Sequence, residues 1–234
     1  MIIKKHIIYF IILVAFMGCK SQGTSQGEKQ DYFKGTIIYD VEVVLSTTDT
    51  SAKAKKSFFG DEMYLTIFKN GDIQRKYNGN SPEGYDLYYV DLEENLVMEK
   101  YNNSDTLFTH KASTQNIIKL NALREDNVKR KVMEYDLKDV SIGAQSLSAK
   151  GNSIAYLTIK YWYTEALKVD KMQYVKINDD LWNYFMRESN GSLFLKYELD
   201  YFNYKVIYTA KEIKPNRYEN YKEKVSTDSP RVSK

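Results

Sequence analysis

The sequence predicts a mainly β protein built on a single curved antiparallel sheet, an incomplete barrel of about ten strands with one or two short helices. Stretches of alternating apolar and polar residues recur along most of the chain, and Asn-, Gly- and Ser-containing turns separate them. Tyrosine, which favours strands, occurs 21 times in 234 residues. Mean hydropathy is only -0.54. These observations favour a large sheet with one face partly open.

The chain begins with the layout of a secretory signal. Lys4 and Lys5 precede the uncharged apolar run 7–17, and Gly18 and Cys19 follow it. A positive head, an apolar core of about 7–15 residues and a small residue at the cleavage site define such signals. A bilayer crossing needs about 20 apolar residues, so a retained membrane anchor is the weaker interpretation.

Cys19 is the one cysteine of the chain. The segment resembles a bacterial lipoprotein signal with a loose lipobox ending in Gly18–Cys19. This resemblance implies removal of residues 1–18, lipidation of Cys19 and attachment to the membrane through that lipid. Lys20 then implies sorting to the outer membrane, and the lack of an acidic run after Cys19 favours the periplasmic side. An ordinary signal peptide with an incidental cysteine is the alternative.

Three further segments follow the signal. Residues 19–31, which include Gly, Ser and Gln, are expected to form a lipidated flexible tether. Residues 32–225 are expected to form a single β-rich domain, and the polar residues 226–234 a disordered tail. Formal net charge is +3, but two lysines belong to the signal, so the remaining chain is nearly neutral and nucleic acid is not an expected partner.

The first half of the domain reads as a meander of strands. In the segment 35–45, Ile37, Tyr39 and Val41 share one face, and residues 46–57 are expected to form a polar loop or a weak edge. Asn70–Gly71 predicts a hairpin turn because both residues tolerate positive φ. The predicted strands are residues 35–45, 63–68, 73–79, 85–93, 95–102 and 106–110.

The second half contains one ambiguous segment, 115–139, which reads as a short helix followed by a strand. Residues 178–191 predict a helix capped at its start by Asp179 or Asp180 and followed by Gly191. The predicted strands are residues 154–164, 193–202 and 204–213.

Several stretches resemble a known family. FKGTIIYDVEV, GDEMYLTIFKNGDIQRKY, YDLYYVDLEENLVMEKY, YWYT, GSLFLKYELD and YTAKEIKP occur in this order over about residues 33–215. They resemble exported Bacteroidetes proteins of the GLPGLI type and related families of unknown function. Such proteins are similar in outline to Lol-type lipoprotein carriers, which implies a half-barrel with helices on its concave side.

Physical reasoning supports a concavity independently of this resemblance. One or two helices cover a sheet of about ten strands only if the sheet curls. A curled and partly plugged sheet leaves an aromatic-lined cavity, which is a typical place for a small apolar ligand.

Aromatic residues supply the candidates for lining such a cavity. In the run Tyr161–Trp162–Tyr163, alternation places the two tyrosines on one face and the tryptophan on the other. Trp182 and Phe185 lie on one side of the predicted helix. Each of these five side chains either lines the cavity or packs in the core.

The sequence offers little catalytic chemistry, and we expect no enzyme activity, cofactor or metal. His110 is the sole histidine after the signal, and we expect it at the surface. One histidine and one lipidated cysteine cannot build a conventional zinc site. The pair Glu93–Glu94 is expected in a turn and the pair Asp179–Asp180 at a helix start, where anions are favourable.

Two functions follow from these features. The first is a non-catalytic envelope lipoprotein that binds an apolar or amphipathic ligand, such as a lipid or its acyl chain, in the concavity of the sheet. The alternative is a structural or interaction subunit of a cell-envelope protein complex, which uses an exposed tyrosine-rich sheet surface.

Overall fold

The protein is described by a computed structural model over residues 31–45, 52–113, 117–124, 130–147, 154–201, 204–215 and 230–233. The predicted signal and nearly all of the predicted tether, with Cys19, lie outside the described residues. The chain divides into two units, and the sheet belongs to the second, Tyr32–Lys234. None of the helices in the described ranges is long and apolar enough to span a bilayer.

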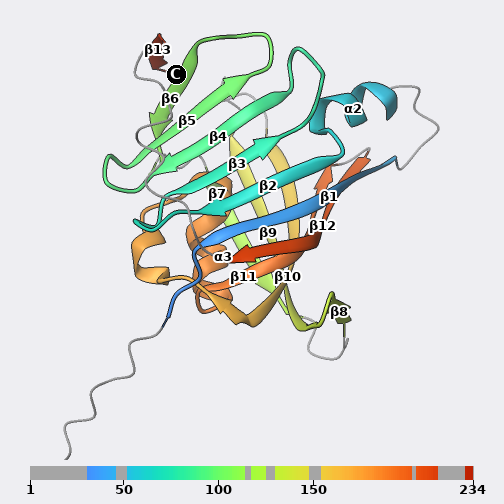
Figure 1. Ribbon diagram of the computed structural model, residues 1–234, viewed down its shortest axis with the longest axis vertical. Coiled ribbons are helices and arrows are strands. Elements are labelled where there is room, and N and C mark those ends of the chain that lie inside the picture. The colour runs from blue at the N-terminus through green and yellow to red at the C-terminus, as the bar shows by residue number, and fades with distance from the viewer. Residues whose placement is uncertain are drawn as a thin grey trace, which may run out of the picture. The chain divides into compact units, whose positions relative to one another are not determined.

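The second unit is mainly β, and one curved, unclosed sheet forms it, which confirms the predicted fold class (Figure 1). The strands are β1 (Gly35–Leu45), β2 (Glu62–Ile67), β3 (Ile73–Tyr77), β4 (Tyr85–Asp91), β5 (Leu96–Tyr101), β6 (Leu107–Lys111), β7 (Ile117–Leu123), β8 (Arg130–Val132), β9 (Tyr135–Leu147), β10 (Ile154–Lys168), β11 (Ser192–Tyr201), β12 (Tyr204–Pro215) and β13 (Arg231–Ser233). Among the described residues the order is β13-β6-β5-β4-β3-β2-β1-β12-β11-β10-β9-β7, with β8 beside β9.

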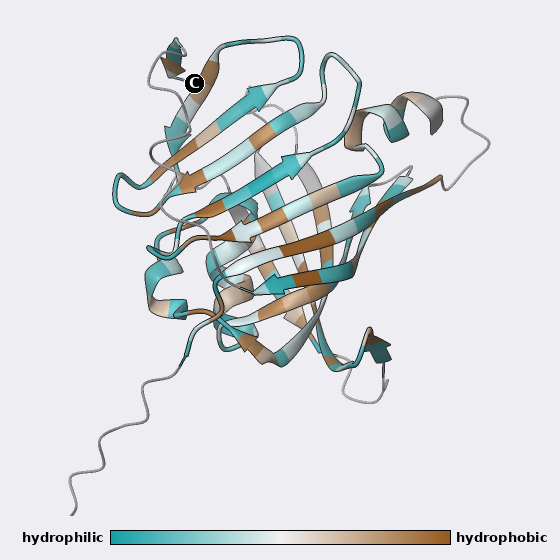
Figure 2. Cartoon of the chain, viewed as in Figure 1, coloured by the Kyte–Doolittle hydropathy of each residue, from teal (hydrophilic) through white to brown (hydrophobic). Residues whose placement is uncertain are grey.

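Strand β1 joins the two halves of the sheet. It pairs antiparallel with β2 on one side and with β12 on the other, so that Ile37 lies opposite both Leu65 and Ile213. We call β2–β6 the N-terminal wing and β9–β12 the C-terminal wing. Figure 2 shows that apolar and polar residues alternate along the strands. This alternation sets the register in which neighbouring strands pair, because a shift by one residue would turn every side chain to the other face.

The polar segment after β1 contains a helix instead of the loop or edge that we predicted. This helix, α2 (Ala52–Phe59), has the sequence AKAKKSFF. Alanine and lysine have high helix propensity, which explains the backbone. Phe59 at its end is buried, and its ring centroid lies 6.3 Å from that of Tyr204. The polarity of the segment favoured a loop, and that expectation did not take the buried Phe59 into account.

The predicted helix at residues 178–191 exists, but it begins later than expected. Two 3₁₀ turns, η1 (Lys171–Tyr174) and η2 (Asp179–Leu181), precede α3 (Trp182–Glu188). Asp180 and Leu181 have positive φ values of 49° and 58°, and Leu181 occupies the N-cap position without a side-chain cap. The prediction that Asp179 or Asp180 caps the helix was therefore wrong, because both carboxylates bond to side chains of the N-terminal wing.

The C-terminal end of α3 follows the prediction. The N–H of Gly191 donates to the carbonyl of Met186 at 2.8 Å, and Gly191 has a φ of 77°. A Cβ at this glycine would lie 2.6 Å from the carbonyl oxygen of Val169. Both the left-handed backbone and the close approach of Val169, which directly follows β10, require glycine here.

Two other segments became strands. The ambiguous residues 115–139 supply β7, β8 and the start of β9, with no helix in their described part. Residues 226–234 were expected to be disordered, yet Arg231–Ser233 forms β13, parallel to β6. Strand β6 otherwise ends the N-terminal wing, and its unpaired backbone groups explain why a short tail segment adds to it.

We predict that Gly191→Ala lowers the free energy of unfolding by about 1–3 kcal/mol, because alanine cannot adopt the left-handed backbone without strain. Gly143→Ala is the matched control, since a Cβ at Gly143 meets nothing within 4 Å. Urea denaturation measures both variants. Equal stability of the two variants would contradict this account of the end of α3.

Candidate functional site

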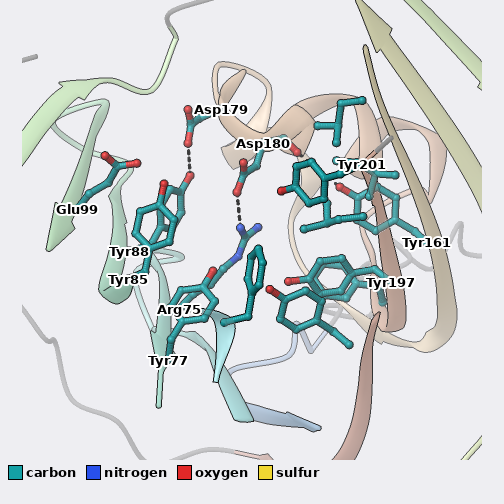
Figure 3. A pocket seen from close by; sticks show the side chains of 16 residues that line it. Arg75, Tyr77, Tyr85, Tyr88, Glu99, Tyr161, Asp179, Asp180, Tyr197 and Tyr201 are labelled. Carbon is teal, nitrogen blue, oxygen red and sulfur yellow. Dashed lines mark hydrogen bonds and ion pairs between the residues drawn. The ribbon is translucent and has the colours of Figure 1, made fainter. Parts of the chain in front are cut away.

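A cavity of about 190 Å³ lies on the concave side of the sheet, between the two wings (Figure 3). Strands β3, β4 and β5 line it on one side, strands β10, β11 and β12 on the other, and η2 contributes two carboxylates. Its lining consists of Phe59, Arg75, Tyr77, Tyr85, Tyr88, Glu99, Leu157, Ile159, Tyr161, Asp179, Asp180, Phe194, Tyr197, Leu199, Tyr201 and Tyr208.

An ion pair between Arg75 and Asp180 crosses the cavity region. The side chain of Arg75 is 9% exposed, and its guanidinium lies 5.0 Å from the ring centroid of Tyr88 and 5.5 Å from that of Trp182. The side chain of Asp180 is 47% exposed, because its carboxylate borders the open space of the cavity. The cavity walls still remove part of the solvent around this carboxylate, which raises the pKa of Asp180, and the charge of Arg75 opposes this shift.

Asp179 faces the N-terminal wing. It accepts hydrogen bonds from the hydroxyl of Tyr88 and from Nε2 of His110, the latter at 3.2 Å. Burial acts to raise the pKa of Asp179, but the hydrogen bonds from His110 and Tyr88 outweigh it and lower the pKa. His110, which the sequence placed at the surface, therefore helps to fix η2 against β4 and β6.

Tyrosines make up most of the aromatic lining. The rings of Tyr197 and Tyr208 stack at 4.2 Å with an interplanar angle of 2°. On the other side of the cavity, Tyr77 and Tyr85 lie next to each other, with ring centroids 5.9 Å apart. Burial raises the pKa of all four of these hydroxyls above the ordinary value, so they are neutral at physiological pH and can both donate and accept hydrogen bonds.

The five aromatic residues chosen from the sequence separate into three environments. Tyr161 lines the cavity, and its ring stacks on that of Phe185 at 4.2 Å. Tyr163, Trp182 and Phe185 are buried in the core to which α3 contributes, outside the lining of the cavity. Trp162 is also buried, and the cationic groups of Arg130, Lys160 and Lys196 lie 5.0, 5.3 and 4.8 Å from its ring.

Arg75 and Glu99 line the cavity but were not among the site residues expected from the sequence. The signal for Arg75 was present in the alternation of β3, because Ile73, Arg75 and Tyr77 share one face and Ile73 is buried. A charged residue on an inward face needs a partner, so it marks a site. Nothing comparable identified Asp180 as that partner, which is 105 positions away in the chain.

The arrangement is suited to binding. It combines neutral hydroxyls, one guanidinium and three carboxylates with aromatic faces and the apolar side chains of Leu157, Ile159 and Leu199. Within the described part of the chain, no cluster of three or more His, Cys, Asp or Glu residues is placed to hold a metal ion. Asp179 and Asp180 are engaged by side chains from the N-terminal wing, which gives both a role in positioning η2.

Comparison with known proteins gives distant structural matches only. No family model and no curated protein matches the chain, so membership of the GLPGLI-type families stays a prediction. The crystal structure of the Mycobacterium tuberculosis lipoprotein LppX is 8% identical, with a TM-score of 0.32 over 80% of this chain and 89% of that one. LprF from Mycobacterium bovis is 11% identical, with the same TM-score and coverage. At this distance the likeness does not indicate what the cavity holds.

We predict that Asp180→Asn destabilises the protein more than Arg75→Met does. Removing the charge of Asp180 leaves a buried guanidinium without its counter-ion. The loss should be about 2 kcal/mol, below the about 3–5 kcal/mol typical of fully buried pairs, because the carboxylate is partly hydrated. Removing Arg75 leaves a carboxylate that cavity water can hydrate, so the cost should stay below about 1 kcal/mol.

Urea denaturation followed by far-ultraviolet circular dichroism measures both variants. If Arg75→Met proved less stable than Asp180→Asn, the side chain that needs its counter-ion would be Asp180 and not Arg75.

Proposed function

We propose that this protein is a non-catalytic lipoprotein of the cell envelope that binds one small amphipathic molecule in the cavity between the wings of its sheet. The lipid on Cys19 would anchor it to the outer membrane, and the tether would hold the domain on the periplasmic side. The observation that carries the proposal is the cavity itself, in which apolar faces and hydrogen-bonding groups line the same space.

The volume of the cavity limits the size of the ligand. A cavity of 150 Å³ accommodates benzene, and sites for drug-sized ligands usually measure about 300–1,000 Å³. At about 190 Å³, this cavity suits one ring or a short chain. A lipid acyl chain is a second candidate, which Leu157, Ile159 and Leu199 favour because they provide an apolar surface on the C-terminal wing.

The alternative function, an interaction subunit with an exposed tyrosine-rich surface, has less support. None of the tyrosines whose burial the structure describes is exposed. They lie in the core, along the cavity or in half-buried positions between neighbouring side chains. The tyrosine content is therefore better explained by the inside of the curved sheet than by an outer interface.

Native mass spectrometry of the full-length protein purified from its own membrane tests the binding function. We predict a co-purified small molecule, and we predict that Leu199→Trp abolishes its retention by filling the cavity. Leu123→Trp is the control, since Leu123 is 70% exposed and lies outside the cavity lining. A ligand that both variants retain equally, or no ligand on the unmodified protein, would overturn this assignment of the cavity.

The anchor is tested by fractionating cells that express Cys19→Ser. We predict that this variant leaves the membrane fraction, because serine has no thiol to form the lipid thioether. Ser21→Ala, which leaves Cys19 intact, should stay in the membrane. Membrane attachment of Cys19→Ser would contradict lipidation at this residue.

A further inference from the structure

We propose that the bound molecule is a neutral ring carrying several hydroxyl groups, of the size of a single sugar unit. This inference rests on the proposed binding function and specifies its ligand class. In this arrangement the ring lies between the two tyrosine-lined walls, with hydroxyl groups directed toward Arg75 and Asp180.

The charges around the cavity disfavour both an anion and a cation. The lining contains one guanidinium, on Arg75, and three carboxylates, on Glu99, Asp179 and Asp180. A carboxylate on the ligand would bond to Arg75 but would face three groups of its own sign. An ammonium would meet the guanidinium of Arg75 as a like charge and could not accept a hydrogen bond from it.

A hydroxyl group satisfies both members of the ion pair. It accepts a hydrogen bond from a guanidinium and donates one to a carboxylate, so two neighbouring hydroxyls can bridge Arg75 and Asp180 without adding charge. Arg75 still has a donor to offer, because its Nε is buried without a hydrogen-bond partner. A buried donor that is left unpaired costs free energy of folding. An acceptor supplied by the ligand, after a small rotation of the guanidinium, would recover part of that cost.

The carboxylate of Asp180 is accessible to a ligand in the cavity. Its side chain is 47% exposed even though Arg75 pairs with it. Figure 3 shows the hydroxyl groups of Tyr197 and Tyr201 directed into the same space from the opposite wall. Donors and acceptors therefore converge on the ligand from both wings, as a molecule with hydroxyls around its rim requires.

The walls themselves fit the faces of such a ring. Tyrosine rings line both sides of the cavity, those of Tyr77 and Tyr85 on one side and those of Tyr197 and Tyr208 on the other. The electron-rich face of an aromatic ring attracts groups with positive edges, and the C–H groups of a saturated sugar ring have this character. The volume of about 190 Å³ exceeds the about 150 Å³ that holds benzene, which leaves room for one six-membered ring with small substituents.

The test uses purified full-length protein and three kinds of compound: methyl β-glucoside with N-acetylglucosamine as neutral sugars, decanoate as an anionic acyl chain, and 2-phenylethylamine as an aromatic cation. Saturation-transfer NMR detects binding, and tryptophan fluorescence gives the affinity, since Trp182 lies 5.5 Å from the guanidinium of Arg75. We expect saturable binding of at least one sugar. Arg75→Met should weaken this binding by about tenfold or more, which corresponds to the loss of a hydrogen bond to a charged group.

Arg130→Met is the matched control, because this arginine also lies 5.0 Å from an indole ring, that of Trp162, but lines no part of the cavity. It should bind the sugar normally. Tyr201→Phe, which removes one cavity hydroxyl from a half-buried side chain, should weaken binding by about fivefold and gives a second reading if Arg75→Met folds poorly.

The outcomes separate the two proposals. Binding of decanoate or 2-phenylethylamine without binding of either sugar would overturn the ligand class and leave the binding function intact. Sugar binding that Arg75→Met and Tyr201→Phe do not change would place the sugar outside the cavity and also overturn the inference. If no compound binds and no molecule co-purifies, the proposed function itself fails.

Discussion

The ion pair between Arg75 and Asp180 is the interaction on which the interior of this protein depends. Arg75 lies on an inward face of β3, where its charge would be unfavourable without a counter-ion. Asp180 supplies that counter-ion from η2, and Asp179 bonds beside it to Tyr88 and His110. These contacts attach the segment before α3 to the N-terminal wing, while Phe185 of α3 packs on Tyr161 of the C-terminal wing. One short segment thus joins both wings.

The same contacts explain an unusual backbone. Asp180 and Leu181 are consecutive non-glycine residues with positive φ. Each such residue costs about 1–3 kcal/mol, and such strain persists only where the surroundings fix it. The bonds of Asp179 and Asp180 to three strands of the N-terminal wing hold this backbone in place. This backbone conformation turns both carboxylates toward β3, β4 and β6. It also places the carboxylate of Asp180 at the edge of the cavity.

Polarity distinguishes this cavity from a simple apolar void beneath a curled sheet. A half-barrel filled only with aliphatic side chains would select for hydrophobicity and little else. Here seven tyrosines share the lining with Arg75 and three acidic residues. Neutral hydroxyls beside a fixed ion pair would orient a ligand as well as hold it. Hydrogen bonds depend on geometry, whereas the burial of apolar area does not. Under the proposed function, a site of this kind would discriminate between ligands of similar size.

Local chemistry allowed the sequence alone to determine most of the strands, the hairpin turn at Asn70–Gly71 and the glycine that ends α3. Side-chain alternation with a period of two predicts strands such as β1 and β10, and a left-handed residue at Gly191 needs no knowledge of distant contacts. Tertiary structure decided the rest. Asp179 and Asp180 fit a helix cap locally, but partners 91 and 105 positions away bond to them instead. Whether Tyr161 or Trp182 faces the cavity likewise depends on how α3 meets the curved sheet, since packing between distant segments leaves no local pattern in the sequence.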